Sequence, residues 1–296
     1  MSRPLKIDLH MHTAVSDGTD TPEEIVERVK EAGIELFSVT DHDAIKGCCA
    51  VTRRLRPGDP AFLAGAEFSC KDGEGQYHIL GYGYDPEAES IRGLVDMGHG
   101  FRMSKLKKRL DFLKERFGFA FSDEDVSALT ALDNPGKPHI GNLMVKYGYA
   151  GTKEEAIRQY INQFHAGSEY VRPEQAIRAI LGAGGVPVLA HPSYGRGDDL
   201  ILGEDMDRRL RRLIGFGLQG VEAFYSGFSA KLQNEVLAFA ERYDLFVTAG
   251  SDYHGRNKLV RLGDTNLPDT GELPAGVQRF LEHMESKIKR YAGGTL

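Results

Sequence analysis

The chain has few cysteines, no long apolar run and no excess of positive charge, and each absence excludes a class of protein. Its three cysteines, Cys48, Cys49 and Cys70, lack Cys-x-x-Cys spacing, which argues against a disulfide framework and a thiolate zinc site. No apolar run approaches the roughly 18 residues of a membrane span, and the start lacks the apolar stretch of a signal peptide. We therefore expect a cytoplasmic protein that is neither secreted nor inserted in a membrane.

The net charge of the chain argues against one class of binding partner. The 43 acidic and 37 basic residues give a net charge of −6, so no global positive field attracts nucleic acid. Long nucleic acid is therefore not the expected partner, although a local groove for a short oligonucleotide is still allowed. The oligomeric state stays open, and a monomer is compatible with the sequence.

Short apolar segments alternate with helical patterns over most of the chain. The first helix is marked by Thr21 as N-cap, by Pro22 at its first position and by Glu24, which closes a capping box. Alternation of strands and helices predicts an α/β fold with a mostly parallel sheet, open or closed into a barrel. The seven expected strands cover residues 5–12, 36–40, 62–68, 77–82, 186–190, 218–223 and 245–249.

The strand rhythm disappears between about residues 100 and 171. The sequence there predicts several helices, with breaks at Gly118, at 134–138 and at 148–151. We expect a helical insertion, residues 101–170, in a discontinuous α/β domain made of residues 1–100 and 171–296.

Six of the ten histidines lie at or just past the ends of expected strands, together with three carboxylates. His10 and His12 are two apart on a strand and so share a face, and Asp252 and His254 repeat this spacing after the last strand. Strand ends of a parallel barrel open onto one face, where distant residues can meet. The nine candidates are His10, His12, Asp17, His42, Glu67, His78, His191, Asp252 and His254.

Imidazoles and carboxylates together predict a divalent metal site. Mn²⁺, Fe²⁺ and Zn²⁺ all accept such ligands, and the lack of thiolates leaves the choice among them open. A single histidine at a strand end is usually structural, but the joint pattern favours ligands. Nine groups with a bridging carboxylate suit two or three ions, which can acidify a water and clamp phosphoryl oxygens.

The motifs that carry these residues resemble the PHP (polymerase and histidinol phosphatase) family of metal-dependent phosphoesterases. They are Asp-Leu-His-Met-His-Thr from Asp8, Ser-Asp-Gly from Ser16, Thr-Asp-His-Asp from Thr40, Gly-Ala-Glu from Gly65, His191, and Ser-Asp-Tyr-His from Ser251. The resemblance implies a distorted (β/α)₇ barrel whose strand ends hold a trinuclear centre. It also implies three ligand sets: His10, His12, Glu67 and Asp252; Glu67, His78 and His191; Asp17, His42 and His254.

The predicted cofactors are three divalent ions, with Mn²⁺ as the first expectation and Fe²⁺ or Zn²⁺ as alternatives. The predicted activity is hydrolysis of a phosphate ester of a small nucleotide or sugar phosphate by a hydroxide that bridges the metals. The sequence is similar to a stand-alone bacterial subgroup that acts on nucleoside 3′,5′-bisphosphates or on cyclic ribose phosphates. Asp41 is expected either to orient an imidazole or to cap the next helix.

Substrate contacts are expected from the insertion, which we predict to cover the active site, and from neighbours of the ligands. His139 is one candidate for the acid that protonates the leaving group, and a metal-bound water is another. The basic stretch that starts at Lys105 reads as a solvated amphipathic helix, and Glu222 as either a partner of the site or a structural carboxylate. The expected substrate-binding residues are Lys137, His139, Arg172, Ser193 and Arg196.

Three other functions compete with a small-molecule phosphatase. One is a 5′–3′ exonuclease that acts on short oligonucleotides. Another is a metal-stabilised binding domain without turnover, which would unfold without metal and hydrolyse nothing. The third is amide or ester hydrolysis of the amidohydrolase type, against which the third ligand set argues.

Overall fold

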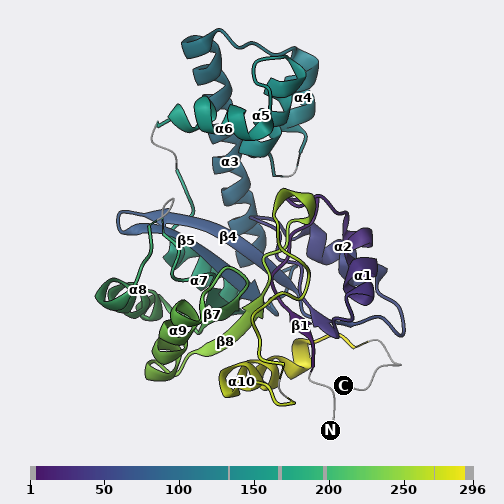
Figure 1. Cartoon of the computed structure of the whole chain (residues 1–296), viewed down its shortest axis with the longest axis vertical. Coiled ribbons are helices and arrows are strands. Elements are labelled where there is room, and N and C mark those ends of the chain that lie inside the picture. Colours follow the sequence, from purple (N-terminus) through teal and green to yellow (C-terminus); the bar gives the residue numbers. More distant parts are fainter. Residues whose placement is uncertain (1–4, 133, 166–168, 196–198, 270, 291–296) are drawn as a thin grey trace. The chain divides into compact units, whose positions relative to one another are not determined.

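The computed structural model of the chain describes residues 5–132, 134–165, 169–195, 199–269 and 271–290. The chain forms two compact units, drawn in Figure 1. Unit 1 comprises Met1–Val95 and Val171–Leu296, and unit 2 comprises Asp96–Tyr170. The second unit therefore begins at Asp96, a few residues before the expected boundary at residue 101.

The described strands of unit 1 form two sheets. The first has the order β1-β2-β3 with parallel pairing, and the second has the order β4-β5-β6-β7-β8. In the second sheet β5 pairs antiparallel with β4 and β6, and β6, β7 and β8 are parallel. The strands are β1 (Ile7–Asp8), β2 (Leu36–Phe37), β3 (Ala61–Phe62), β4 (Gly65–Asp72), β5 (Gly75–Tyr82), β6 (Val186–Leu189), β7 (Gly220–Tyr225) and β8 (Phe246–Gly250).

This pairing confirms the α/β class but corrects two details. The expected strand 62–68 is split into β3 and β4 at residues 63 and 64, and at Gly65, the first residue of β4, a Cβ would lie 2.2 Å from the Ser38 Oγ. The second sheet is mixed rather than mostly parallel. Pairing among the described strands does not itself close a barrel, but the isolated bridges Met11↔Tyr253 and His42↔Glu67 connect the two sheets.

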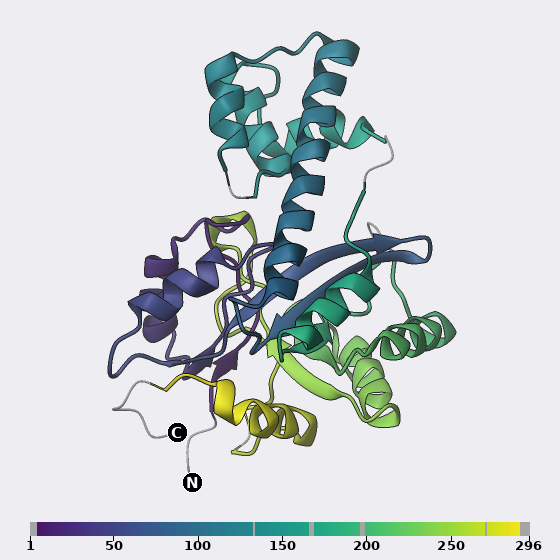
Figure 2. The same cartoon turned by 180° about the vertical axis from the view of Figure 1, so that it is seen from behind.

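Helices cover the sheets of unit 1. The predicted capping box of α1 is confirmed, because Thr21 and Glu24 exchange hydrogen bonds there. Packing contacts join α1 to α2, α7 to β4, β5 and β6, α9 to β7 and β8, and α10 to β8, as can be followed from behind in Figure 2. These helices are α1 (Pro22–Glu31), α2 (Lys46–Arg54), α7 (Pro173–Gly182), α8 (Gly203–Phe216), α9 (Ala230–Arg242) and α10 (Ala275–Met284), with the short η2 (Gly255–Asn257) and η3 (Glu285–Lys287).

Unit 2 is helical and has its own apolar core, which includes Leu113, Ile140 and Met144. Gly118 follows α3 with a φ of 73°, a conformation that glycine adopts easily. No helix in the described part of the chain combines the length and apolar character needed to cross a membrane. The helices are α3 (Glu89–Phe117), which starts in unit 1, α4 (Asp123–Thr130), α5 (Lys137–Lys146), α6 (Lys153–Gln159) and η1 (Ile161–Gln163).

Candidate metal centre

The nine candidate ligands of the sequence analysis lie together in unit 1. Three overlapping groups have ligand atoms within 4.8 Å of one another: His12, Asp17, His42 and His254; His10, His12 and Glu67; His42, Glu67 and His78. His191 and Asp252 adjoin these groups through contacts of 3.3 Å, from His191 Nε2 to Glu67 Oε1 and from Asp252 Oδ1 to His12 Nε2.

Glu67 is the centre of the cluster and is buried on β4. Its Oε1 lies 3.0 Å from His78 Nδ1, and its Oε2 lies 3.3 Å from the Nε2 atoms of both His10 and His12 and 3.2 Å from His42 Nδ1. Burial alone would raise the pKa of Glu67, but the imidazoles around it hold that pKa well below its usual range. The two oxygens of one ionised carboxylate thus face different histidines, which is the arrangement of a bridging ligand.

His10 and His12 carry the clearest sign that a cation belongs here. Their Nε2 atoms are buried and make no hydrogen bond to any described residue, although carboxylate oxygens lie 3.3 to 3.5 Å away. The Nδ1 of His10 lies 2.8 Å from Glu222 Oε1, to which it can donate, and in the neutral imidazole Nε2 then presents a lone pair to a metal. Buried lone pairs that face carboxylate oxygens repel them unless a positive charge lies between. A divalent ion would supply that charge.

The third group lies at the more open side of the cluster, where Asp17 is about one-third exposed. His254 Nδ1 donates to the Asp252 carbonyl at 2.9 Å, which leaves Nε2 as an acceptor 3.3 Å from Asp17 Oδ1. His42 Nε2 lies 4.0 Å from Asp17 Oδ2. Imidazole lone pairs that face a carboxylate fit the same donor chemistry as the first two groups.

Several histidines of the cluster have shifted pKa values, and His12 and His42 shift in opposite directions. Burial opposes protonation of His12, but the nearby carboxylates of Asp252 and Glu67 raise its pKa to about 10. Burial dominates at His42 and lowers its pKa to about 4. Because a metal competes with protons for these nitrogens, metal binding is coupled to pH.

Glu222, which sequence reasoning left undecided, orients two ligands from β7. It is fully buried; one oxygen accepts the hydrogen bond from His10 Nδ1, and the other accepts from the backbone N–H of His191 at 2.9 Å. A carboxylate behind an imidazole fixes its tautomer and strengthens it as a ligand. The signal in the sequence was the position of Glu222 in a strand whose end faces the site.

Asp41 does not cap α2, and it reaches an imidazole only through Ser16, whose Oγ lies 3.5 Å from His12 Nδ1. Its carboxylate accepts hydrogen bonds from the backbone and hydroxyl of Thr13, both at 2.8 Å, and from the Ser16 hydroxyl at 2.7 Å. Helix α2 begins after Ile45 without a side-chain cap. Asp41 therefore holds the turn that leads to Asp17, because the donors of that turn need an acceptor in a buried place.

The expected substrate contacts fall into different places. The Ser193 hydroxyl is buried and has no hydrogen-bond partner among the described residues, whereas the Arg172 side chain donates to Gln175 at 3.4 Å. In unit 2, Lys137 donates to Asn162 at 2.6 Å, and His139 accepts from the Gly136 backbone at 3.1 Å. Arg196 lies outside the described residues.

Three basic or aromatic side chains were misjudged or missed. Lys105 is not a solvated surface residue: its amine lies 3.3 Å from the centre of the Tyr170 ring, and burial lowers its pKa to about 8. Lys258 forms an ion pair with Asp252 and donates to the Tyr225 hydroxyl at 3.1 Å. Tyr225 ends β7, so the same strand-end rule that selected the histidines could have found it.

Known proteins are similar to this chain over most of its length. Residues 8–171 match the PHP domain family. A 3′,5′-nucleoside bisphosphate phosphatase of Chromobacterium violaceum is 30% identical over 97% of this chain and 99% of its own length. A 5′-3′ exoribonuclease of Haemophilus influenzae is 28% identical, over 87% of this chain and 93% of its own length.

Solved structures give the same result. A crystal structure from Bifidobacterium adolescentis, assigned as a metal-dependent phosphoesterase, has a TM-score of 0.77 and 29% identity, covering 95% of this chain and 97% of that one. The sequence match extends over more than half of the chain, and the likeness in structure extends over nearly all of it. The chain belongs to the PHP domain family.

Proposed function

We propose that this PHP-family phosphoesterase hydrolyses a phosphate ester of a small nucleotide or sugar phosphate, and that a nucleoside 3′,5′-bisphosphate is the first substrate to test. One observation carries the proposal: Glu67 faces several imidazoles, among them two whose buried Nε2 atoms lack a hydrogen-bond partner in the described chain. The phosphatase of Chromobacterium violaceum, similar along its whole length, supports the choice of substrate.

The ligands suit three divalent ions, and we propose Mn²⁺ first, with Fe²⁺ or Zn²⁺ as alternatives. His10, His12, Glu67 and Asp252 would hold one ion, Glu67, His78 and His191 the second, and Asp17, His42 and His254 the third. Ions bound there would acidify a water and neutralise charge on the phosphate oxygens. The bridges Met11↔Tyr253 and His42↔Glu67, beside these ligands, support a distorted (β/α)₇ barrel as the frame.

The chain's own groups would orient the ester around this centre. Lys258 and Tyr225 contact Asp252, and their Nζ and hydroxyl groups are suited to bind a phosphate oxygen. We propose that the helical insertion covers the site and that Lys137 and His139 contact the substrate, with Arg172 and Ser193 from unit 1. His139 is a candidate donor of the proton that the leaving group needs.

Metal-dependent turnover tests the proposal directly. Chelator-treated protein should release no phosphate from a nucleoside 3′,5′-bisphosphate, and Mn²⁺ should restore release. Elemental analysis should find close to three ions per chain. A loaded protein that hydrolyses no phosphate ester, including a cyclic ribose phosphate, would instead indicate a metal-stabilised binding domain.

A second candidate is a 5′–3′ exonuclease, which the similarity to the Haemophilus influenzae exoribonuclease favours. The two candidates differ in how the rate depends on substrate length. A higher kcat/KM on a short 5′-phosphorylated oligoribonucleotide than on the bisphosphate would identify the exonuclease. Turnover of amide or carboxylic ester substrates with no phosphate release would point to amidohydrolase chemistry.

A further inference from the structure

Unit 2 carries three basic residues on one face of α3. Arg102, Lys105 and Arg109 are three and four positions apart, so they lie within roughly 60° of one another around the helix axis. The acidic residues of α3 in unit 2 are at least about 80° away from each of them around the same axis: Asp96, Asp111 and Glu115. The helix therefore separates its positive charges from its negative ones.

Two of these cations are partly removed from water and lack a carboxylate partner. The Lys105 amine lies 3.3 Å from the centre of the Tyr170 ring, and the Nε of Arg109 is buried without a hydrogen bond to any described residue. Neither side chain forms an ion pair with a carboxylate in the described part of the chain. Because a desolvated charge without a counter-charge costs free energy, this arrangement favours an added anion.

The three positive charges are also close enough to oppose one another. Burial, together with the charges of Arg109 and Arg102, lowers the pKa of Lys105 to about 8, although Tyr170 acts in the opposite direction. Burial and the charge of Arg102 also lower the pKa of Arg109. Cations that disfavour each other in this way would all gain from one anion placed among them.

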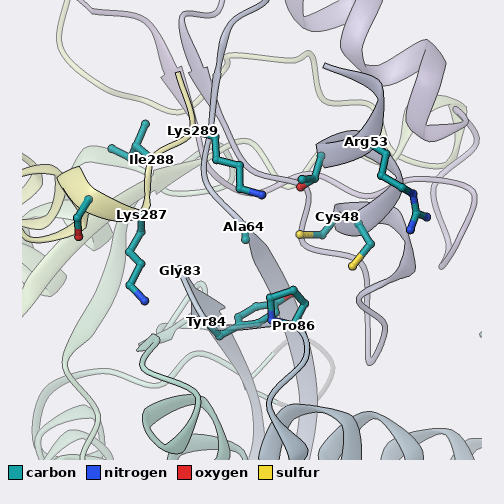
Figure 3. A pocket seen from close by; sticks show the side chains of 12 residues that line it. Cys48, Arg53, Ala64, Gly83, Tyr84, Pro86, Lys287, Ile288 and Lys289 are labelled. Atoms are coloured by element: carbon teal, nitrogen blue, oxygen red, sulfur yellow. The ribbon is translucent and has the colours of Figure 1, made fainter. Parts of the chain in front are cut away.

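The cavity of about 370 Å³ in unit 1 also has basic residues in its lining, but they do not converge (Figure 3). Lys287 and Arg53 lie at opposite margins of that cavity and point apart. The Lys287 amine lies 3.6 Å from the place of a Cβ on Gly184, which is outside the lining. Mutual proximity thus distinguishes the cluster on α3 from that cavity.

Arginine and lysine are the usual protein donors to phosphate oxygens, and three of them match the double negative charge of a phosphate group. We propose that Arg102, Lys105 and Arg109 form a phosphate-binding site in unit 2, with the Lys105 amine held in place by the Tyr170 ring. The choice of phosphate over other anions rests on the proposed function, in which the substrate is a phosphate ester.

Acetylation of the Lys105 amine by acetic anhydride reports on this site and can be followed by mass spectrometry of the peptide. With a pKa of about 8, a large share of this amine is uncharged and reactive at pH 8, whereas an ordinary lysine is almost fully charged. Bound phosphate should protect Lys105, because it covers the amine and favours its charged form.

The experiment measures this rate in the metal-loaded protein at constant ionic strength. Inorganic phosphate at ten times its Kd should slow acetylation roughly tenfold, whereas chloride and adenosine should not. Protection by AMP at lower concentrations than inorganic phosphate would assign the site to the phosphate of a nucleotide. Equal protection by the two would assign it to free phosphate.

Variants of the cluster test whether the protection arises there. Arg109→Gln should lose most of the protection, and Arg109→Lys, which keeps the charge, should retain it. Lys108→Gln, at an exposed position of the same helix, is the matched control and should behave as the wild type. Urea unfolding checks that each variant is folded, and Arg102→Gln provides a second variant that removes a charge.

Two results would overturn the inference. One is a Lys105 acetylation rate that does not change at any phosphate or AMP concentration. The other is equal protection in Arg109→Gln and Lys108→Gln, because the effect would then arise elsewhere. Phosphate release from the bisphosphate is measured on the same preparations. Turnover without protection would refute only the site in unit 2, and protection without turnover would refute only the proposed function.

Discussion

Replacement of Glu222 by glutamine tests whether metal binding depends on a buried carboxylate that touches no proposed ion. Glu222 accepts hydrogen bonds from His10 Nδ1 at 2.8 Å and from the His191 backbone at 2.9 Å, one on each oxygen. Glutamine has the same shape but only one oxygen. In Glu222→Gln one of the two donors must therefore face an NH₂ group.

The structure allows an estimate of the cost. A buried donor left without an acceptor costs about 1 to 3 kcal/mol of folding free energy. Loss of the negative charge behind His10 should weaken metal binding by roughly 10- to 100-fold, the usual effect of removing such a partner. Saturating metal should restore most of the turnover, because Glu222 positions a ligand and does not touch the substrate.

The assay titrates Mn²⁺ into chelator-treated protein and follows both bound metal and phosphate release. Urea unfolding of the metal-free protein gives the folding cost separately. Glu241→Gln, on the exposed face of α9, is the matched control and should change neither quantity. Wild-type metal affinity and unfolding in Glu222→Gln would refute the assigned role.

Three further predictions concern the metal ligands and the turn behind them. His254→Ala should reduce phosphate release by at least about 100-fold at saturating Mn²⁺, because Asp17 loses its facing imidazole. Gly47→Ala should lower the free energy of unfolding by about 1 to 3 kcal/mol, since the new Cβ would lie 1.9 Å from Asp41 Oδ2. In the metal-free protein, His42 should contribute a loss of stability of about 1.4 kcal/mol per pH unit as the pH falls from 6.5 toward 4, because burial lowers its pKa and only the unfolded chain binds the proton. His12, whose pKa is raised to about 10, should contribute stability that is lost as the pH rises from 6.5 toward 10.

Each of these predictions has a control. His283→Ala, on the exposed face of α10, should leave phosphate release intact, and equal losses in both histidine variants would contradict the role of His254. Gly215→Ala on α8, where a Cβ meets nothing within 4 Å, should be neutral or stabilising. His42→Gln should flatten the acid side of the stability profile measured by urea unfolding, and an unchanged slope would rule out His42 as its source.

Much of the site could be predicted because its chemistry follows the local pattern of the chain. The spacing of His10 and His12 places both on one face wherever the segment is extended. Asp252 has a φ of 58°, so the same rule does not explain how Asp252 and His254 come together. The capping box of α1 was equally local and is confirmed. Local rules of this kind depend on backbone geometry over a few residues, which the sequence specifies directly.

Other features depend on contacts between segments that are far apart in the chain. Glu222 meets His10 across 212 positions, and no local pattern tells a buried partner from a structural carboxylate. Asp41 accepts hydrogen bonds from Thr13 and Ser16 because the buried donors of that turn need an acceptor. The expected strand 62–68 is divided because Ala61–Phe62 pairs with β2, whereas Gly65–Asp72 pairs with β5.

By itself, the sequence determined the types of donor atom and the strand ends that carry them, since a residue's chemistry and the two-residue repeat of a strand are properties of the chain. Only the tertiary structure decided which nitrogen faces which oxygen, as in the contact of His10 with Glu222. Those choices follow from how buried polar groups are satisfied after distant segments have packed.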